Sequence, residues 1–182
     1  MLRIGGGRST AKFIRKHHLY GSVGENCLIM KKKLPLYSNL VVLYNNVWGA
    51  SNVGFVTHDG IHHMFNQKYE TKEFVEKVGC IEIMDNVFVG SGTRILYNTR
   101  IGSNVIIGSD SLVNKDIPDN SVYAGVPARY ICSFDEYVAK AKQYSEMFRS
   151  NFGLDKISDM DKELARMIYK EFCIKKDKKE TK

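Results

Sequence analysis

The sequence predicts an all-β solenoid, a parallel β-helix of six-residue repeats, and three observations support this. Branched apolar residues occupy every sixth position in one row, which comprises Ile83, Val89, Ile95, Ile101, Ile107 and Val113. A second row two residues earlier holds only small or β-branched side chains, namely Ile81, Val87, Thr93, Thr99, Val105 and Ser111. Glycine follows the apolar position at Gly90, Gly102 and Gly108, where we expect turns that need backbone freedom. The strand period of two and the helix period of about 3.6 residues do not produce a repeat of six, whereas stacked short strands do.

The six-residue spacing continues towards the N-terminus but stops in the middle of the chain. Apolar residues at whole multiples of six before Ile83 are Val23, Ile29, Val41, Val47 and Val53, with Pro35 breaking the series. The repeat therefore forms two blocks, 23–57 and 83–118, separated by a polar and charged stretch at 58–80. Insertions in solenoids emerge as loops from one face, often the binding face, so we expect the chemistry at 58–80.

Three regions follow from this pattern. Residues 1–22 form an N-terminal capping segment with a candidate helix at 10–19, which would cover the open end of the first coil. Residues 23–132 form the solenoid, with 58–80 extruded from it. Residues 133–182 form a helical extension with a basic tail. This extension begins at a capping box in which Ser133 is the N-cap and Glu136 the third helical residue, and we expect a second helix from about Ser158.

The formal net charge of +7 is concentrated at the two ends of the chain. Residues 1–33 hold eight basic side chains against the single acid Glu25, and the tail from Lys170 holds six lysines against three acids. No basic segment interleaved with aromatic residues is present, which argues against a nucleic-acid partner. The basic ends fit either a solvated face or peripheral contact with an anionic membrane surface.

Targeting and redox signals predict a cytoplasmic protein. The sequence has no apolar run long enough for a membrane span and no apolar N-terminal segment typical of a signal peptide. The four cysteines are scattered and form no CxxC pair, at Cys27, Cys80, Cys132 and Cys173. This spacing favours unpaired thiols in a reducing compartment.

Four stretches of the second block resemble a known family. They are IMDNVFVGSG at 83–92, IGSNVIIG at 101–108, NKDIPD at 114–119 and AGVPAR at 124–129. This pattern resembles the hexapeptide-repeat acyltransferases, in particular the maltose/galactoside O-acetyltransferase branch and the related polysaccharide and capsule O-acetyltransferases. The resemblance covers about residues 23–132. It implies a left-handed coil, a homotrimer, acetyl-CoA bound between neighbouring solenoids and one catalytic histidine at the start of the protruding loop.

Matched residue by residue, the resemblance also implies roles for single positions. His58 stands at the place of the catalytic histidine. The CoA-contacting positions fall on Gly90, Ser91, Ser109, Asn114, Lys115 and Arg129. Among these, the charges of Lys115 and Arg129 suit the CoA phosphates, as a point charge and a planar fork respectively.

The sequence also departs from the family pattern. Tyr97 and Asn98 replace a frequent Pro-Gly, and asparagine tolerates the left-handed conformation that such a turn requires. Phe88 stands where several relatives have Trp, which keeps an aromatic ring at that position. The first block matches weakly, so no acceptor-binding residues are carried over from the family. Trp48, Phe55 and Tyr97 are candidates either for lining an acceptor groove or for plain packing.

Transfer of an acetyl group from a thioester to a sugar hydroxyl needs a general base, because an alcohol is a weak nucleophile at neutral pH. A neutral imidazole suits this role, so His58 would take the hydroxyl proton while a backbone N–H stabilises the oxyanion. No covalent enzyme intermediate is required. Asp59 is adjacent, but neighbouring strand residues point to opposite faces. It is therefore a poor candidate for orienting His58 and a better candidate for binding acceptor hydroxyls.

We therefore predict a cytoplasmic acetyl-CoA-dependent O-acetyltransferase that acts on a sugar or a glycan precursor. The alternatives are an antibiotic-modifying acetyltransferase of the same superfamily, a non-catalytic assembly scaffold, and a metal-dependent hydratase. His58, Asp59, His62 and His63 have ligand types suited to a metal, but no histidine follows His63, and we expect no metal. A serine acetyltransferase is disfavoured because the long N-terminal helical region of that group is absent here.

Overall fold

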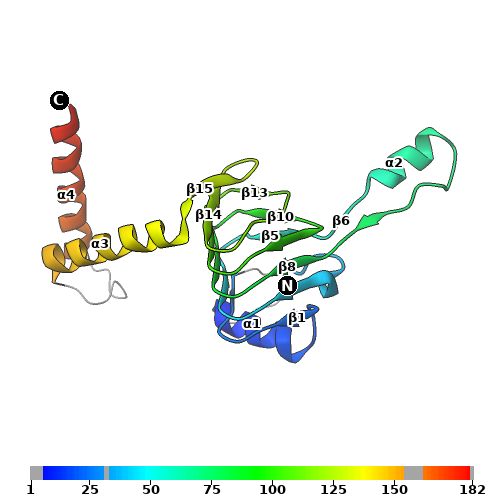
Figure 1. Cartoon of the computed structure of the whole chain (residues 1–182), viewed down its shortest axis with the longest axis horizontal. Helices are drawn as coiled ribbons and strands as arrows, with labels where there is room; N and C mark the ends of the chain where they lie inside the picture. The colour runs from blue at the N-terminus through cyan, green and yellow to red at the C-terminus, as the bar shows by residue number, and fades with distance from the viewer. Residues whose placement is uncertain (1–5, 31–32, 154–161, 181–182) are drawn as a thin grey trace. The chain divides into compact units, whose positions relative to one another are not determined.

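The computed structural model describes residues 6–30, 33–153 and 162–180. The chain divides into two compact units, Met1–Tyr137 and Val138–Lys182. The first unit is a stack of short strands with a helix over one end and an insertion protruding from its side (Figure 1). The stacked strands are β1 (Ser22–Val23), β2 (Leu28–Ile29), β3 (Val41–Leu43), β4 (Val47–Gly49), β5 (Gly54–Val56), β8 (Ile81–Ile83), β9 (Val87–Val89), β10 (Arg94–Leu96), β11 (Thr99–Ile101), β12 (Val105–Ile107), β13 (Leu112–Val113), β14 (Ser121–Ala124) and β15 (Arg129–Ser133).

These strands belong to three sheets that the chain visits in rotation. Sheet A has the order β1-β3-β8-β11, sheet B the order β15-β14-β12-β9-β4-β2, and sheet C the order β13-β10-β5. Neighbouring strands are parallel, except for the antiparallel pair β14 and β15. Partner residues such as Val87 and Val105 lie 18 positions apart, so one coil contains three six-residue repeats. The stacked parallel repeats are confirmed, and the left-handed winding stays a prediction.

Both predicted rows form the core of this stack. Every residue of the two rows is at most 3% exposed, including the polar Thr93, Thr99 and Ser111. Burial of each branched side chain contributes about 1.5–3 kcal/mol to the free energy of folding. Thr93 and Ser111 donate their hydroxyl hydrogens to the carbonyl of Gly108, over 3.0 and 2.7 Å, which satisfies two of the buried polar groups.

The structure corrects the register expected for the first block. Val41 pairs with Ile81 and Val47 with Val87, so both lie in the other row from Ile83. Val53 lies in that other row too, because its neighbour Gly54 pairs with Arg94. Partners in the second block are 18 positions apart, whereas Val23 and Leu43 are 20 apart and Val41 and Ile81 are 40 apart. The segment between β2 and β3 therefore adds two residues to its coil, and the segment between β5 and β8 adds 22. Both additions lie between Val23 and Ile83, and together they are a multiple of six, so Val23 stays in the row of Ile83. Only the second addition lies between Val41 and Ile83, so Val41 falls in the other row.

The glycines of the repeat serve a different purpose from the one expected. Gly90, Gly102 and Gly108 do not have positive φ angles. A Cβ atom at Gly90 would instead lie 2.5 Å from the backbone nitrogen of Ser109 in the next coil, so close packing of coils demands glycine there.

Asparagines supply the left-handed turns. Residues with φ between 55° and 60° at the corners are Asn26, Asn46, Asn52, Asn86, Asn98, Asn104 and Asn120. The left-handed conformation expected for Asn98 is thereby confirmed. At the corner between sheets A and B, Asn46 donates to Asn86 over 3.0 Å and Asn86 donates to Asn104 over 3.1 Å. Asn104 donates in turn to Asn120 over 2.9 Å, so the side-chain amides form a continuous column.

Helix α1 (Gly7–Lys16) lies against β1 and β2 and covers the first coil. Its apolar residues Ala11 and Ile14 join the core, at 4% and 1% exposure. An ion pair between Arg15 and Glu25 ties the helix to the turn after β1. The expected helix at 10–19 thus exists, but it begins and ends three residues earlier.

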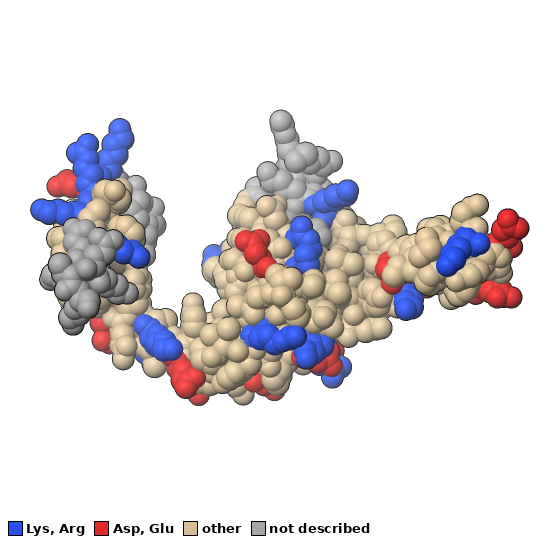
Figure 2. Space-filling view, turned by 90° about the horizontal axis from the view of Figure 1, so that it is seen from above, with Lys and Arg blue, Asp and Glu red and all other residues tan. Residues whose placement is uncertain are grey.

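The stretch 58–80 leaves the stack as a two-stranded antiparallel ribbon. Strands β6 (His58–Asp59) and β7 (Lys77–Val78) pair His58 with Val78 and Asp59 with Lys77, and α2 (Ile61–Lys68) lies beyond them. Figure 1 shows this insertion projecting away from the coils. Its far end carries both acidic and basic side chains (Figure 2).

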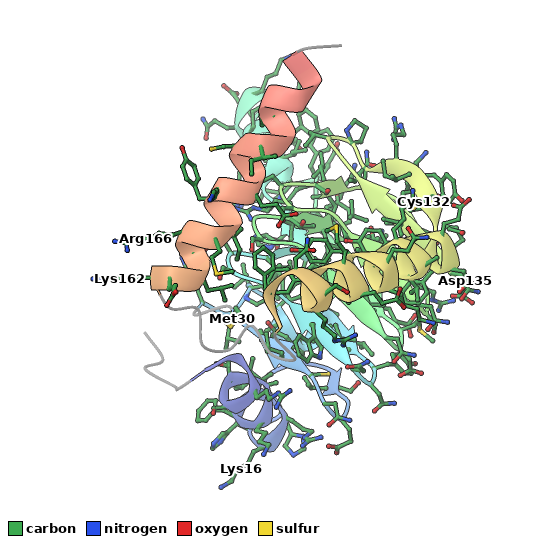
Figure 3. The ribbon with its side chains drawn as sticks, turned by 90° about the vertical axis from the view of Figure 1, so that its left-hand side faces the viewer. Lys16, Met30, Cys132, Asp135, Lys162 and Arg166 are labelled. Atoms are coloured by element: carbon green, nitrogen blue, oxygen red, sulfur yellow. The ribbon has the colours of Figure 1, made fainter. Side chains whose placement is uncertain are left out.

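The described residues of the second unit are helical apart from Gly153. Helix α3 (Phe134–Phe152) begins at the predicted capping box, near the labelled Asp135 in Figure 3. The Glu136 carboxylate accepts from Ser133 N over 2.9 Å, and Glu136 N donates to Ser133 Oγ over 3.2 Å, which confirms this box. Helix α4 (Lys162–Glu180) contacts α3 through a hydrogen bond from Asn151 to Glu171. The expected helix start near Ser158 lies outside the described residues. Among those residues, no helix is both long and apolar enough to cross a membrane.

Candidate active site

His58 stands where the chain leaves the coil for the insertion. It follows β5 by two residues, and Thr57 between them is fully buried. The Thr57 hydroxyl donates to the carbonyl of Leu36, which fixes the departure point against the segment between β2 and β3. Pairing of β6 with β7 then holds the backbone of His58 in extended form opposite Val78.

The His58 ring is held by packing on one side. The Tyr37 ring meets it edge to face, with ring centroids 5.5 Å apart and an angle of 88° between the planes. His58 Nδ1 is buried and has no hydrogen-bond partner among the described residues. The side chain as a whole is half-buried, so the imidazole is neither free in solvent nor sealed in the core.

Asp59 is directed to a different partner from His58. The Tyr97 hydroxyl donates to Asp59 Oδ2 over 2.7 Å, and Ile61 N donates to Oδ1 over 3.2 Å. The hydrogen bond from Tyr97 lowers the pKa of Asp59 and raises the pKa of Tyr97. Asp59 is therefore an ionised anchor between the insertion and the corner after β10. Its proposed contact with acceptor hydroxyls stays a prediction.

Tyr37, which packs on His58, and Glu76, which bonds to Tyr37, were not singled out from the sequence. The Tyr37 hydroxyl donates to Glu76 Oε2 over 2.6 Å, and this bond raises the pKa of Tyr37. Both residues line a cavity of about 480 Å³ together with Asn39, Leu40, Val75 and Val78. Tyr37 and Glu76 lie in the two segments that break the repeat, 39 positions apart. No periodic signal links such segments, so the sequence offered no way to pair them.

Four of the candidate CoA-binding residues lie along one corner of the stack. Gly90 N donates to the carbonyl of Ile107, which places Gly90 beside Ser109, and Ser91 accepts from Asp110 N over 2.8 Å. One coil further, Ala124 packs over Gly108 and pairs with Arg129. Gly90, Ser91, Ser109 and Arg129 thus share the edge where the chain leaves sheet B.

Asn114 and Lys115 lie at a different corner. They follow β13 of sheet C, at the corner where Tyr97 follows β10 one coil earlier. Within one chain, the structure therefore does not bring these two residues together with the other four. His58 follows β5 and belongs to the same corner as Asn114 and Lys115.

The aromatic candidates differ in their burial and in their contacts. Phe55 is 8% exposed and packs in the core edge-on to Tyr20, with ring centroids 6.0 Å apart, so it does not line a groove. Trp48 and Phe88 are register partners on the outer face of sheet B, and the Arg8 guanidinium lies 5.6 Å from the centre of the Trp48 ring. Tyr97 contacts a residue of the insertion, because its hydroxyl donates to Asp59.

The other histidines of the insertion pair with each other. The rings of His62 and His63 lie 3.9 Å apart in α2. Across the part of the chain that the structure describes, no three His, Cys, Asp or Glu side chains are grouped so as to hold a metal ion.

Sequence comparisons extend this picture. Residues 81–115 match the family model described as Bacterial transferase hexapeptide (six repeats). Protein CapG of Staphylococcus aureus is 33% identical over 144 residues, which cover 77% of this chain and 82% of CapG. Galactoside O-acetyltransferases of Escherichia coli and Lactococcus lactis are 40% and 33% identical. These matches cover 50% and 60% of this chain but only 43% and 61% of the respective relatives.

A solved structure shows a similar arrangement. The maltose O-acetyltransferase from Clostridium difficile 630 superposes with a TM-score of 0.50 at 26% sequence identity. The superposition covers 70% of this chain and 86% of that one.

Proposed function

The chain belongs to the hexapeptide-repeat transferases, and on that premise we propose that it transfers an acetyl group from acetyl-CoA to a hydroxyl of a sugar or glycan precursor. Several relatives support the acetyl group and the oxygen acceptor, since they are named galactoside or maltose O-acetyltransferases. Four free cysteines support a reducing, cytoplasmic setting for the reaction.

The observation that carries the proposal is the position of His58. It lies at the point where the repeat gives way to the insertion, with one ring nitrogen buried and the ring packed against Tyr37. A half-buried imidazole that packing holds at one angle is suited to proton transfer at neutral pH. His58 would accept the proton of the acceptor hydroxyl and hold it for the leaving sulfur. Bound acetyl-CoA would supply the activated acetyl thioester.

The candidate cofactor residues suggest how acetyl-CoA is held. The edge formed by Gly90, Ser91 and Ser109 lacks side-chain bulk, and Arg129 adds a positive charge to it. Asn114 and Lys115 would act from the other corner, to which His58 also belongs. We propose a homotrimer in which the first corner of one copy faces the second corner of its neighbour. The acetyl-CoA site would then lie between copies, with Arg129 and Lys115 on its phosphates.

Release of CoA in the presence of a panel of sugars, nucleotide sugars, oligosaccharides and antibiotics tests this function. We expect turnover with saccharides, and turnover confined to antibiotics would favour the antibiotic-modifying alternative. His58→Ala should lower kcat by about 10²- to 10⁴-fold, the usual contribution of a general base. His63→Ala, in the same insertion, is the matched control and should retain turnover. Undiminished kcat in His58→Ala would refute the assignment of the base.

A further inference from the structure

We propose that Tyr37 is the positioning residue for His58, with its ring setting the angle of the imidazole and Glu76 holding that ring in place. The inference rests on the proposed function, in which His58 is the general base. It goes further because Tyr37 belongs to the weakly matching first block and was not a candidate from the sequence.

The first step is the packing of the two rings. An edge-to-face arrangement, here at 88° and 5.5 Å between centroids, is the preferred geometry of paired rings and resists rotation of either one. A catalytic histidine is commonly oriented by a hydrogen bond to its second ring nitrogen. No described residue makes such a bond to Nδ1 of His58. The Tyr37 ring is therefore the contact that orients the imidazole.

The second step is the backbone of Tyr37. Its φ of 53° and ψ of 44° are left-handed, a conformation that asparagines supply at most corners of the stack. A bulky aromatic residue adopts it at a cost, and such strain persists where the surroundings impose it. Here the neighbouring Leu36 carbonyl accepts from Thr57, and the Tyr37 hydroxyl donates to Glu76. The strained residue is thus held at both its backbone and its side chain.

The third step is the origin of the three residues. Tyr37 comes from the segment between β2 and β3, whereas His58 and Glu76 come from the insertion. Glu76 directly precedes β7, the strand that pairs with β6 and His58. The two segments that break the six-residue repeat therefore meet at the imidazole.

This arrangement distinguishes the ring from the hydroxyl. The ring contacts His58, and the hydroxyl contacts Glu76. Tyr37→Leu, which retains apolar bulk but no ring, should lower kcat about 10- to 100-fold, because misplacement of a catalytic group by about 1 Å has costs of this order. The KM for acetyl-CoA should stay unchanged. Tyr37→Phe keeps the ring and should remain within about threefold of the parent kcat.

A matched control is available on sheet A. Tyr44 is also exposed and donates to a glutamate, Glu82, over 3.1 Å, but it has no contact with His58. Tyr44→Leu should leave kcat unchanged. Equal kcat for Tyr37→Leu and the parent protein, or an equal fall in Tyr44→Leu, would overturn the proposal. Where Tyr37→Leu does not fold, Tyr37→Met, which also lacks a ring, replaces it. This variant should lower kcat over the same range, and an unchanged kcat would again overturn the proposal.

A measurement without substrate separates this proposal from the proposed function. The imidazole ¹⁵N resonances of His58, assigned with His58→Ala, should shift or broaden in Tyr37→Leu but not in Tyr44→Leu. This response supports the positioning role even where the parent protein transfers no acetyl group, an outcome that refutes the proposed function alone. Unperturbed His58 resonances in a folded Tyr37→Leu variant would refute the positioning role alone.

Discussion

Asp59 and His58 are sequence neighbours with separate environments, which is what the alternation of side chains along an extended strand predicts. Both Asp59 oxygens accept hydrogen bonds, from Tyr97 and from the backbone of Ile61, and none comes from His58. The bond from Tyr97 keeps the pKa of Asp59 below its ordinary value. The carboxylate thus serves first to tie the insertion to the corner after β10.

Tyr97→Phe should release this tie and raise the pKa of Asp59 towards its ordinary value. Because the folded-state pKa of Asp59 is lowered, its contribution to stability is present above the unfolded pKa and is lost as pH falls through the folded value. The variant should therefore have a lower Tm than the parent at neutral pH, and the difference should shrink in acid. Carboxyl NMR titration and thermal unfolding measure both effects. Tyr69→Phe, at the far end of the insertion, is the control, and a Tm difference independent of pH would contradict the account.

At the scale of elements, the corner between sheets A and B depends on its asparagine column. Each asparagine meets two needs, since it accepts a left-handed backbone and bonds to an adjacent coil, and Asn86 and Asn104 bond to the coils on both sides. Glycine would accept the left-handed backbone but would make no side-chain hydrogen bond. Alanine would do neither. The corner is therefore a site where the usual preference for alanine over glycine is reversed.

Asn86→Ala should destabilise the fold by about 1–2 kcal/mol more than Asn86→Gly, because alanine is strained at the φ of 59° found there. Both variants lose the bonds to Asn46 and Asn104. Chemical denaturation gives the two unfolding free energies. Ser103, on the same corner but without a positive φ, provides the reference, and there we expect alanine to be at least as stable as glycine. If the alanine and glycine variants had the same order of stability at Asn86 and at Ser103, the role given to the asparagine column would be refuted.

At the scale of the whole molecule, the candidate residues divide between two corners of the stack. His58, Asn114 and Lys115 follow strands of sheet C, whereas Gly90, Ser109 and Arg129 belong to the edge of sheet B. A ligand held by both groups would be shared most directly between neighbouring copies. This separation is the structural reason for proposing a homotrimer.

Mixed oligomers test that arrangement. His58→Ala and Arg129→Ala should each be impaired alone, but their co-expression should restore part of the turnover, because some interfaces then combine His58 of one copy with Arg129 of another. Native mass spectrometry checks that mixed trimers of the 20.7 kDa chain have formed. Mixed trimers no more active than the single variants would refute a site shared in this way.

The sequence alone was sufficient for the repeating core and insufficient for its exact register. Every residue of the two predicted rows is buried, because a six-residue spacing reports the inward positions of stacked strands directly. The phase of Val41 was wrong, since an addition of two residues between β2 and β3 leaves no periodic trace. The glycines were recognised as special, but close packing between coils, rather than turn conformation, is what requires them.

The sequence by itself determined the stacked repeat and the capping box at Ser133, because each depends on neighbours at fixed spacing. Only the tertiary structure decided that Tyr37 packs on His58 and bonds to Glu76, and that Tyr97, rather than the histidine, is the partner of Asp59. The hydrogen bonds of Tyr37 and Tyr97 join residues 39 and 38 positions apart, across segments whose lengths follow no period. Their meeting depends on how the coils close in space, and a one-dimensional pattern does not record it.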